Sequence, residues 1–190
     1  LLAGTRKDGK SLLYKKVLNF LKNSQQSGGF GGGLPRMNEL LRILRKYNLL
    51  PVIFFLKSRA DCDNAQVMCS DYQTVEEPER KAGRRRRISD LVEKTPHLAD
   101  HKQMPFLVEQ AAAAHHSGQL PAWKLLVETL MTEGYLDAVF ATSTVAAGVN
   151  FPARTIAFLN SDRFNGREFV ALNPTEFHQM TGRAGRRGMD

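Results

Sequence analysis

Two arginines of the segment QMTGRAGRRG, residues 179–188, have the chemistry to act on phosphate groups. Arg183 and Arg186 lie three residues apart, so both guanidinium groups share one face if the segment is helical. Such permanently charged, fork-shaped donors match the triphosphate oxygens on which charge builds up during hydrolysis, the role of an arginine finger. A glycine–arginine tail that binds RNA without specificity, or a solvated basic end, is the open alternative.

Polar residues follow three apolar segments that we expect to be strands. The candidates are Lys57, Ser58 and Arg59 after the first segment, His116, Ser117 and Gly118 after the second, and Thr142, Ser143 and Thr144 after the third, with Gly148 and Asn150 beyond. The carboxyl ends of parallel strands share one edge of a sheet, so these groups predict a surface for a phosphodiester backbone. In the plainer interpretation the hydroxyls only cap a helix and the cations are solvated.

Hydrophobic periodicity predicts the elements that must position these residues. Strands are expected in VIFFL (52–56), AAAAHH (111–116), LDAVFAT (136–142) and RTIAFLN (154–160), and helices from Met37, after Ser58, over 120–134 and near the C-terminus. Gly134 is the expected stop of the helix over 120–134. Strands alternating with helices predict an α/β fold with a parallel sheet covered on both faces.

Two stretches stand apart from this pattern. Residues 1–33 are predicted to form a connector that ends in a glycine-rich linker, and residues 34–190 to form one domain. Within this domain, the polar residues from about 73 to 110, which include Arg84–Arg87, are predicted to form a helical insertion. The connector contains GTRKDGKS, which fits the phosphate-loop pattern up to Lys10 and Ser11. Only Leu1, Leu2 and Ala3 precede it, and Asp-Gly favours a turn, so we interpret it as a connector turn.

The bulk composition narrows the class of partner. Lys and Arg number 27 against 19 acidic residues, a net charge of +8 that favours an anionic partner, nucleic acid first. No apolar run approaches the ~20 residues of a membrane span, so no membrane partner is expected. Cys62 and Cys69 suit reduced, buried thiols on a helix, which indicates a cytoplasmic protein.

A metal site is not expected. His97 and His101 have the spacing of a zinc helix, but the glutamate of either zinc-protease motif and a third ligand are missing. The adjacent His115 and His116 cannot point the same way from a strand, so they are not expected to chelate together.

Three segments carry a resemblance to a known family. The resemblance is to the second, C-terminal RecA-like lobe of superfamily 2 DExH-box helicases, in the branch of exosome-associated RNA helicases and relatives that act on DNA. The segments that carry it are AAHHSGQLPAWK, LDAVFATSTVAAGVNFPARTIAF and PTEFHQMTGRAGRRG. The resemblance runs from about Pro51 to the end and is interrupted by the insertion. It implies a RecA-like fold and an ATP-dependent motor on single-stranded RNA or DNA, with RNA favoured by likeness alone.

The resemblance also implies roles for individual residues. The turns that contact the nucleic-acid strand in the family correspond to Lys57–Arg59, His116–Gly118 and Thr142–Thr144. The family's ATP-sensing glutamine corresponds to Gln179, and its arginine fingers correspond to Arg183 and Arg186. Its nucleotide contacts correspond to Gly148 and Asn150, with Gly182 beside the fingers. ATP and Mg²⁺ would be held mainly by the N-terminal RecA-like lobe of the same chain. This segment alone is therefore expected to be inactive. The alternatives are a non-catalytic basic nucleic-acid-binding module and a self-contained phosphate-loop NTPase that uses Lys10.

Overall fold

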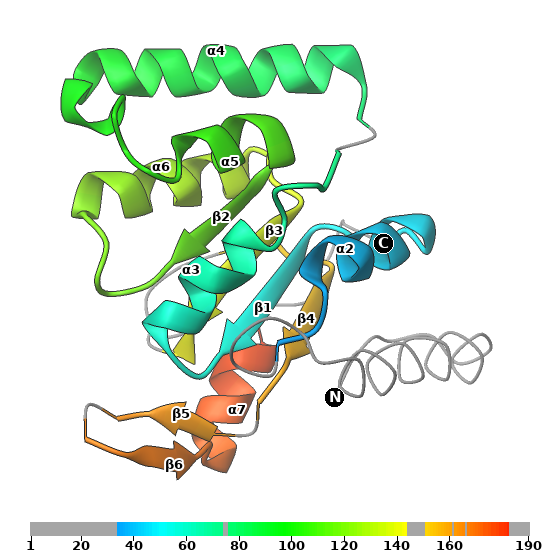
Figure 1. Ribbon diagram of the computed structural model, residues 1–190, viewed down its shortest axis with the longest axis vertical. Helices are drawn as coiled ribbons and strands as arrows, with labels where there is room; N and C mark the ends of the chain where they lie inside the picture. Colours follow the sequence, from blue (N-terminus) through cyan, green and yellow to red (C-terminus); the bar gives the residue numbers. More distant parts are fainter. Residues whose placement is uncertain (1–33, 74–75, 144–150, 161, 166, 183–190) are drawn as a thin grey trace.

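Four parallel strands form the centre of the molecule. The computed structural model describes residues 34–73, 76–143, 151–160, 162–165 and 167–182. The strands are β1 (Val52–Leu56), β2 (Ala112–His115), β3 (Ala138–Thr142) and β4 (Thr155–Phe158), in the order β2-β3-β1-β4. All three pairings are parallel (Figure 1), which confirms the predicted α/β class and a RecA-like sheet.

Helices cover both faces of this sheet because its strands are apolar on both sides. All five residues of β1 are buried, and they alternate between two cores, as the two-residue period of a strand requires. One core receives Val52, Phe54 and Leu56, and the other receives Ile53 and Phe55. An apolar run without alternation is typical of a parallel strand buried on both faces.

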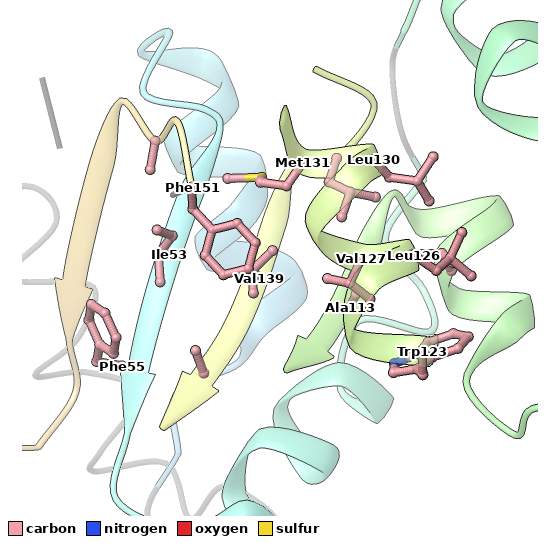
Figure 2. Packing of buried hydrophobic residues seen from close by; sticks show 14 of the residues in the cluster. Ile53, Phe55, Ala113, Trp123, Leu126, Val127, Leu130, Met131, Val139 and Phe151 are labelled. Atoms are coloured by element: carbon pink, nitrogen blue, oxygen red, sulfur yellow. The ribbon is translucent and has the colours of Figure 1, made fainter. Parts of the chain in front are cut away.

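The first core lies under α2 (Met37–Lys46) and α3 (Arg59–Val67). The buried side of α2 consists of Met37, Leu40, Leu41 and Leu44. The second core lies under α6 (Pro121–Thr132), and Figure 2 shows Met131 of this helix directed toward Phe151. Met180 adds α7 (Pro174–Thr181) to the same core. As predicted, α6 stops before Gly134, which has a φ of +79°, the left-handed conformation that favours glycine after a helix.

The edge strand β2 is protected by a side chain. Gln66 on α3 donates from Nε2 to the Ala112 carbonyl (3.2 Å) and accepts at Oε1 from the Ala114 amide (3.3 Å). A primary amide carries one donor and one acceptor group, so it replaces a missing neighbouring strand over these residues. Burial of Gln66 at 1% exposure is thus compatible with its amide, because both the nitrogen and the oxygen have a backbone partner.

The insertion is helical, as expected, and consists of α4 (Pro78–Lys94), the short 3₁₀ helix η1 (Pro96–Leu98) and α5 (Met104–Gln110). In Figure 1, α4 lies outermost and packs across the layer of α5 and α6. Gly83 permits this close packing: a Cβ added there would lie 2.9 Å from the Tyr135 ring. The insertion is therefore docked tightly against the sheet domain.

Buried charges hold α4 in this position. Arg84 is fully buried and bonds to Glu76 (Nη2–Oε1, 2.6 Å) and to the Val108 carbonyl (2.9 Å). Close by, Asp137 at the start of β3 accepts from Arg80 on α4 (3.1 Å) and pairs with Arg45 on α2. One charge network thus connects α2, α4 and the amino end of the sheet, at the edge opposite the predicted site.

The C-terminal part contains an element that the sequence did not predict. β5 (Asp162–Phe164) and β6 (Phe169–Ala171) form an antiparallel hairpin separate from the main sheet. α7 follows it, with Pro174 in its first turn and an Asn173–Glu176 capping box. The predicted turn and linker in residues 1–33, with Lys10, and the domain boundary there lie outside the described residues.

Within the described residues, no helix combines the length and apolarity needed to cross a bilayer. Cys62 and Cys69 are free thiols, and both are fully buried, as the sequence predicted.

Loss of the Arg84 side chain should strongly destabilise the fold. Arg84→Ala leaves the buried Glu76 carboxylate with fewer cationic partners and the Val108 carbonyl without this donor. We expect the free energy of unfolding to fall by about 3 kcal/mol. Urea denaturation of the 190-residue chain, followed through the fluorescence of the buried Trp123, measures this. Arg86→Ala, at an exposed position of the same helix, is the matched control and should change stability by less than ~0.5 kcal/mol.

Both thiols should be unreactive in the folded chain. Burial raises the pKa of Cys62 and of Cys69, so the thiolate that attacks a disulfide reagent is scarce as well as inaccessible. At about pH 8, a chromogenic disulfide reagent should label neither residue without denaturant and both in urea. Rapid labelling of the native chain would contradict the packing of α3 against the sheet.

Candidate nucleic-acid and nucleotide interface

The carboxyl ends of three neighbouring strands lie at one level. Leu56 at the end of β1 pairs with Thr142 at the end of β3, and Ala141 of β3 pairs with His115 at the end of β2. The turns that follow these strands therefore meet at one edge, as the sequence predicted. We call the turns 57–59, 116–118 and 142–143 the strand-end turns.

The turn after β1 combines a helix cap with two cations. Ser58 is the N-cap of α3: its Oγ accepts from the Asp61 amide (3.1 Å) and donates to Asp61 Oδ2 (2.8 Å). Its hydroxyl is thus used within the chain, as the plainer interpretation anticipated for a capping residue. Lys57 Nζ lies 5.2 Å from the centre of the Phe169 ring on β6, while Arg59 is exposed.

The turn after β2 has a buried and an exposed part. The His116 ring is 5% exposed and bonds to Asp63 Oδ1 of α3 through Nε2 (3.2 Å). The Gly118 amide donates to the other ring nitrogen, Nδ1, at 3.2 Å, so Nδ1 is the acceptor of the ring and Nε2 the donor to Asp63. Ser117 and Gly118 are exposed. In this turn, Ser117 and Gly118 are accessible to a ligand, and the buried His116 ring supports them from the core side.

The first two turns touch each other. A Cβ added at Gly118 would lie 3.2 Å from Arg59 Cδ and 3.2 Å from His116 Nδ1. Gly118 is therefore packed between the Arg59 stem and the His116 ring, where a larger side chain would have to displace one of them. In the turn after β3, Thr142 and Ser143 are half-buried, and Thr144 lies outside the described residues.

The residues expected to meet the nucleotide are only partly described. Gln179 is exposed on the last turn of α7, and Gly182 is exposed at its C-cap. Phe177 of the same helix stacks on Phe158 at the end of β4, with ring centres 4.9 Å apart (for the elements, see Figure 1). This contact fixes α7 beside the carboxyl end of the sheet. The remaining candidates, Gly148, Asn150, Arg183 and Arg186, lie outside the described residues.

The two adjacent histidines point in opposite directions, as predicted. His115 Nε2 lies 2.8 Å from Glu128 Oε1 on α6, and its ring meets the edge of Phe151, whereas His116 faces α3. Burial lowers the pKa of His115, Lys124 lowers it further, and Glu128 partly offsets this by favouring the charged ring. His115 is therefore a neutral core residue at neutral pH.

The rejected metal candidates have packing roles or are exposed. His101 stacks on Trp123 with ring centres 3.7 Å apart, and His97 is exposed on η1. The part of the chain that the structure describes contains no group of three or more His, Cys, Asp or Glu side chains arranged to hold a metal.

Sequence reasoning missed the residues that support these turns. Asp63, Gln103 and Gln119 bond to one another or to His116, although they come from separate elements. Gln103 belongs to a polar stretch without periodicity, so no local signal indicated its burial. Sequence patterns likewise did not single out Phe169 or Phe177. The signal available was weak: each is an aromatic residue in or just before the predicted C-terminal helix.

Comparisons with known proteins agree with this geometry. No family model matches the chain. It is 39% identical over 181 residues to the probable helicase HelY of Mycobacterium leprae, which covers 89% of this chain and 20% of that protein. It is 35% identical over 175 residues to the human exosome RNA helicase MTR4, covering 90% of this chain and 17% of that protein.

The chain is homologous to part of the DExH-box helicases. A third relative, the chloroplastic DExH-box ATP-dependent RNA helicase DExH15 of Arabidopsis thaliana, is 34% identical over 94% of this chain and 14% of its own length. The chain thus spans a fifth or less of the length of these curated relatives. The sequence identities confirm the family resemblance. Because the chain covers only part of each relative, the activity of a whole helicase is stated below as a proposal.

His115 should make this domain less stable in mild acid. Its pKa is lowered in the folded state relative to about 6.5, so as pH falls below that value the unfolded chain takes up the proton first. Stability present at about pH 7 is then lost toward pH 5, and His115→Gln should reduce that loss. Urea titrations of both proteins over this range measure it, with His97→Gln, at an exposed position, as the control. Equal pH slopes for wild type and His115→Gln would contradict a neutral, buried His115.

Proposed function

We propose that this chain is the C-terminal motor lobe of an ATP-dependent RNA helicase. The observation that carries the proposal is the alignment of the strand-end turns at one edge of a parallel sheet, in a chain homologous to DExH-box helicases. Ligands of open α/β sheets bind at the carboxyl ends of the strands. The free, buried thiols favour a reducing compartment such as the cytoplasm.

The strand-end turns form one side of a groove for a single strand. Lys57 and Arg59 supply cations and Ser117 supplies a hydroxyl, while Gly118, whose amide donates to His116, leaves room for a close approach of the nucleic acid. Such groups bind phosphate oxygens and position a nucleic-acid strand without reading its base sequence. Ser58 and His116 act indirectly in this groove, because their side chains already bond within the chain. Thr142 and Ser143 complete it at the end of β3, and we assign Thr144, the next residue in the sequence, to the same contact.

The nucleotide side of the lobe extends from the exposed end of α7. Gln179 and Gly182 lie on this turn, and Arg183 and Arg186 follow directly in sequence. We assign the two arginines to the triphosphate oxygens of ATP, with Gly148 and Asn150 as further nucleotide contacts. ATP and Mg²⁺ are held mainly by the N-terminal RecA-like lobe in this proposal.

In this arrangement the chain contributes transition-state stabilisation and strand positioning. The arginines donate hydrogen bonds as charge builds up on the phosphoryl oxygens, and closure of the cleft between the lobes brings them there. Opening of the cleft after hydrolysis moves the strand-end turns relative to the first lobe. The net charge of +8 also suits a non-catalytic basic module, which would bind RNA equally well and be indifferent to these arginines.

Substitution of one arginine separates these functions. In the full-length protein, Arg186→Ala should lower RNA-stimulated ATP hydrolysis by about 10³-fold or more, because a finger acts on the transition state. RNA affinity should stay within about threefold of wild type, because the lost contact is to the nucleotide. Steady-state phosphate release and fluorescence anisotropy with labelled RNA measure the two effects.

Arg86→Ala, at an exposed position on α4 far along the chain, serves as the control and should leave both values unchanged. Unaltered hydrolysis in Arg186→Ala would support the non-catalytic module instead. ATP hydrolysis by the isolated 190 residues, abolished by Lys10→Ala, would support the self-contained NTPase.

A further inference from the structure

The insertion contributes one buried polar side chain to the region beneath the strand-end turns. Gln103, the residue before α5, is 4% exposed and donates from Nε2 to Asp63 Oδ1 on α3 (2.5 Å). Its Oε1 accepts from Gln119 Nε2 at 2.8 Å. Gln103 therefore connects α3 to the loop between β2 and α6, although it belongs to neither.

Both partners of Gln103 lead to the same turn. Asp63 Oδ1 also accepts from His116 Nε2 (3.2 Å), and Gln119 Oε1 accepts from the His116 backbone amide (3.3 Å). The hydrogen bonds thus run in a closed ring through His116, Asp63, Gln103 and Gln119. Every link in this ring is a donor–acceptor pair with the correct polarity when the Gln103 amide has this one orientation.

The ring fixes the turn 116–118 from its buried side. Asp63 orients the His116 ring, and the oriented ring accepts from the Gly118 amide (3.2 Å). Gly118 in turn packs against Arg59 of the neighbouring strand-end turn. A change at Gln103 is therefore transmitted through three hydrogen bonds, by way of Asp63 and the His116 ring, to the exposed residues proposed to contact the nucleic acid.

We propose that Gln103 is a positioning residue for strand binding, through which the helical insertion sets the affinity of this lobe for single-stranded nucleic acid. This inference rests on the proposed function and assigns a role to the insertion within it. Among the described residues, the insertion reaches the ring through Gln103 and, more loosely, through Lys102, whose Nζ lies 3.8 Å from Asp63 Oδ2. In contrast, α4 is anchored at the opposite edge through Arg84 and Arg80. The amide of Gln103 is needed for the hydrogen bonds to Asp63 and Gln119, whereas packing alone would accept an apolar side chain at this position.

Substitution of Gln103 should weaken RNA binding without changing the chemical step. In the full-length protein, Gln103→Ala should raise the RNA concentration for half-maximal ATPase stimulation by about three- to tenfold, the range usual for residues that act through others. The maximal rate and the RNA-independent rate should stay within about twofold of wild type, because the nucleotide contacts are elsewhere. The probe is a fluorescein-labelled oligouridylate of about 20 nucleotides, enough to cross one such groove.

The matched control is Gln110→Ala, which removes a glutamine of the same insertion that donates to the Ser70 carbonyl, away from the turn. It should match wild type in all three parameters. Asp63→Asn keeps an oxygen that accepts from Gln103 and His116, so its RNA affinity should stay close to wild type, whereas Asp63→Ala should behave as Gln103→Ala. A merely structural role would give no such difference between Asn and Ala in the RNA dependence.

A second route tests the same ring if Gln103→Ala unfolds. Gln119 is half-buried on the loop, and Gln119→Ala breaks the ring from the surface. It should raise the half-maximal RNA concentration similarly, and the two substitutions together should add little to either alone. Wild-type affinity in Gln119→Ala, or equal effects of Gln103→Ala and Gln110→Ala, would overturn the inference. Failure of the wild-type protein to bind the oligonucleotide at all would instead overturn the proposed function.

Discussion

The parallel register of β1, β2 and β3 is the constraint on which the rest of the structure depends. Phe54 pairs with Phe140, and Phe140 pairs with Ala114, so the three strands end together. A shift of one residue would exchange the faces on which their side chains pack. Both cores resist this, because each face of the sheet is buried under helices. The alignment of the strand-end turns is thus a consequence of core packing on both faces.

Amide side chains make this packing compatible with polar backbone and polar turns. Gln66 hydrogen-bonds to the edge strand β2, and Gln103 closes the ring beneath the turn 116–118. A neutral amide offers donors and an acceptor without the desolvation cost of a charge, which suits positions that are 1% and 4% exposed. The charged network of Arg84 and Asp137 lies at the other edge, where it anchors the insertion. The two edges therefore differ in chemistry: arginine–carboxylate pairs anchor the amino ends, whereas the carboxyl ends are positioned by two amide side chains and a histidine around the single carboxylate of Asp63.

The elements that the sequence predicted correctly are those whose signals are local. VIFFL as a buried strand, Ser58 as a helix cap and Gly134 as a helix stop each depend on a few adjacent residues. The β5–β6 hairpin escaped prediction because strands of three residues are too short to show a period. Arg84 stands in a run of four arginines that looks solvated. Its partners are Glu76 and the carbonyl groups of Val108 and Tyr135, which lie 24 and 51 residues away, so its burial depends on distant contacts.

The same distinction applies to the candidate site. Sequence patterns predicted which turns lie together at the carboxyl edge of the sheet, and the strand register confirms that arrangement. They could not separate residues that face outward from those that support them, because Ser58 and His116 have the same polar character as Lys57 and Ser117. Hydrogen-bond geometry makes the separation: a side chain whose donors and acceptors are already used within the chain has little left for a ligand. Polar side chains in such turns therefore divide into contacts and supports, and the supports extend through Asp63 and Gln103 into an insertion that no local pattern connects to the site.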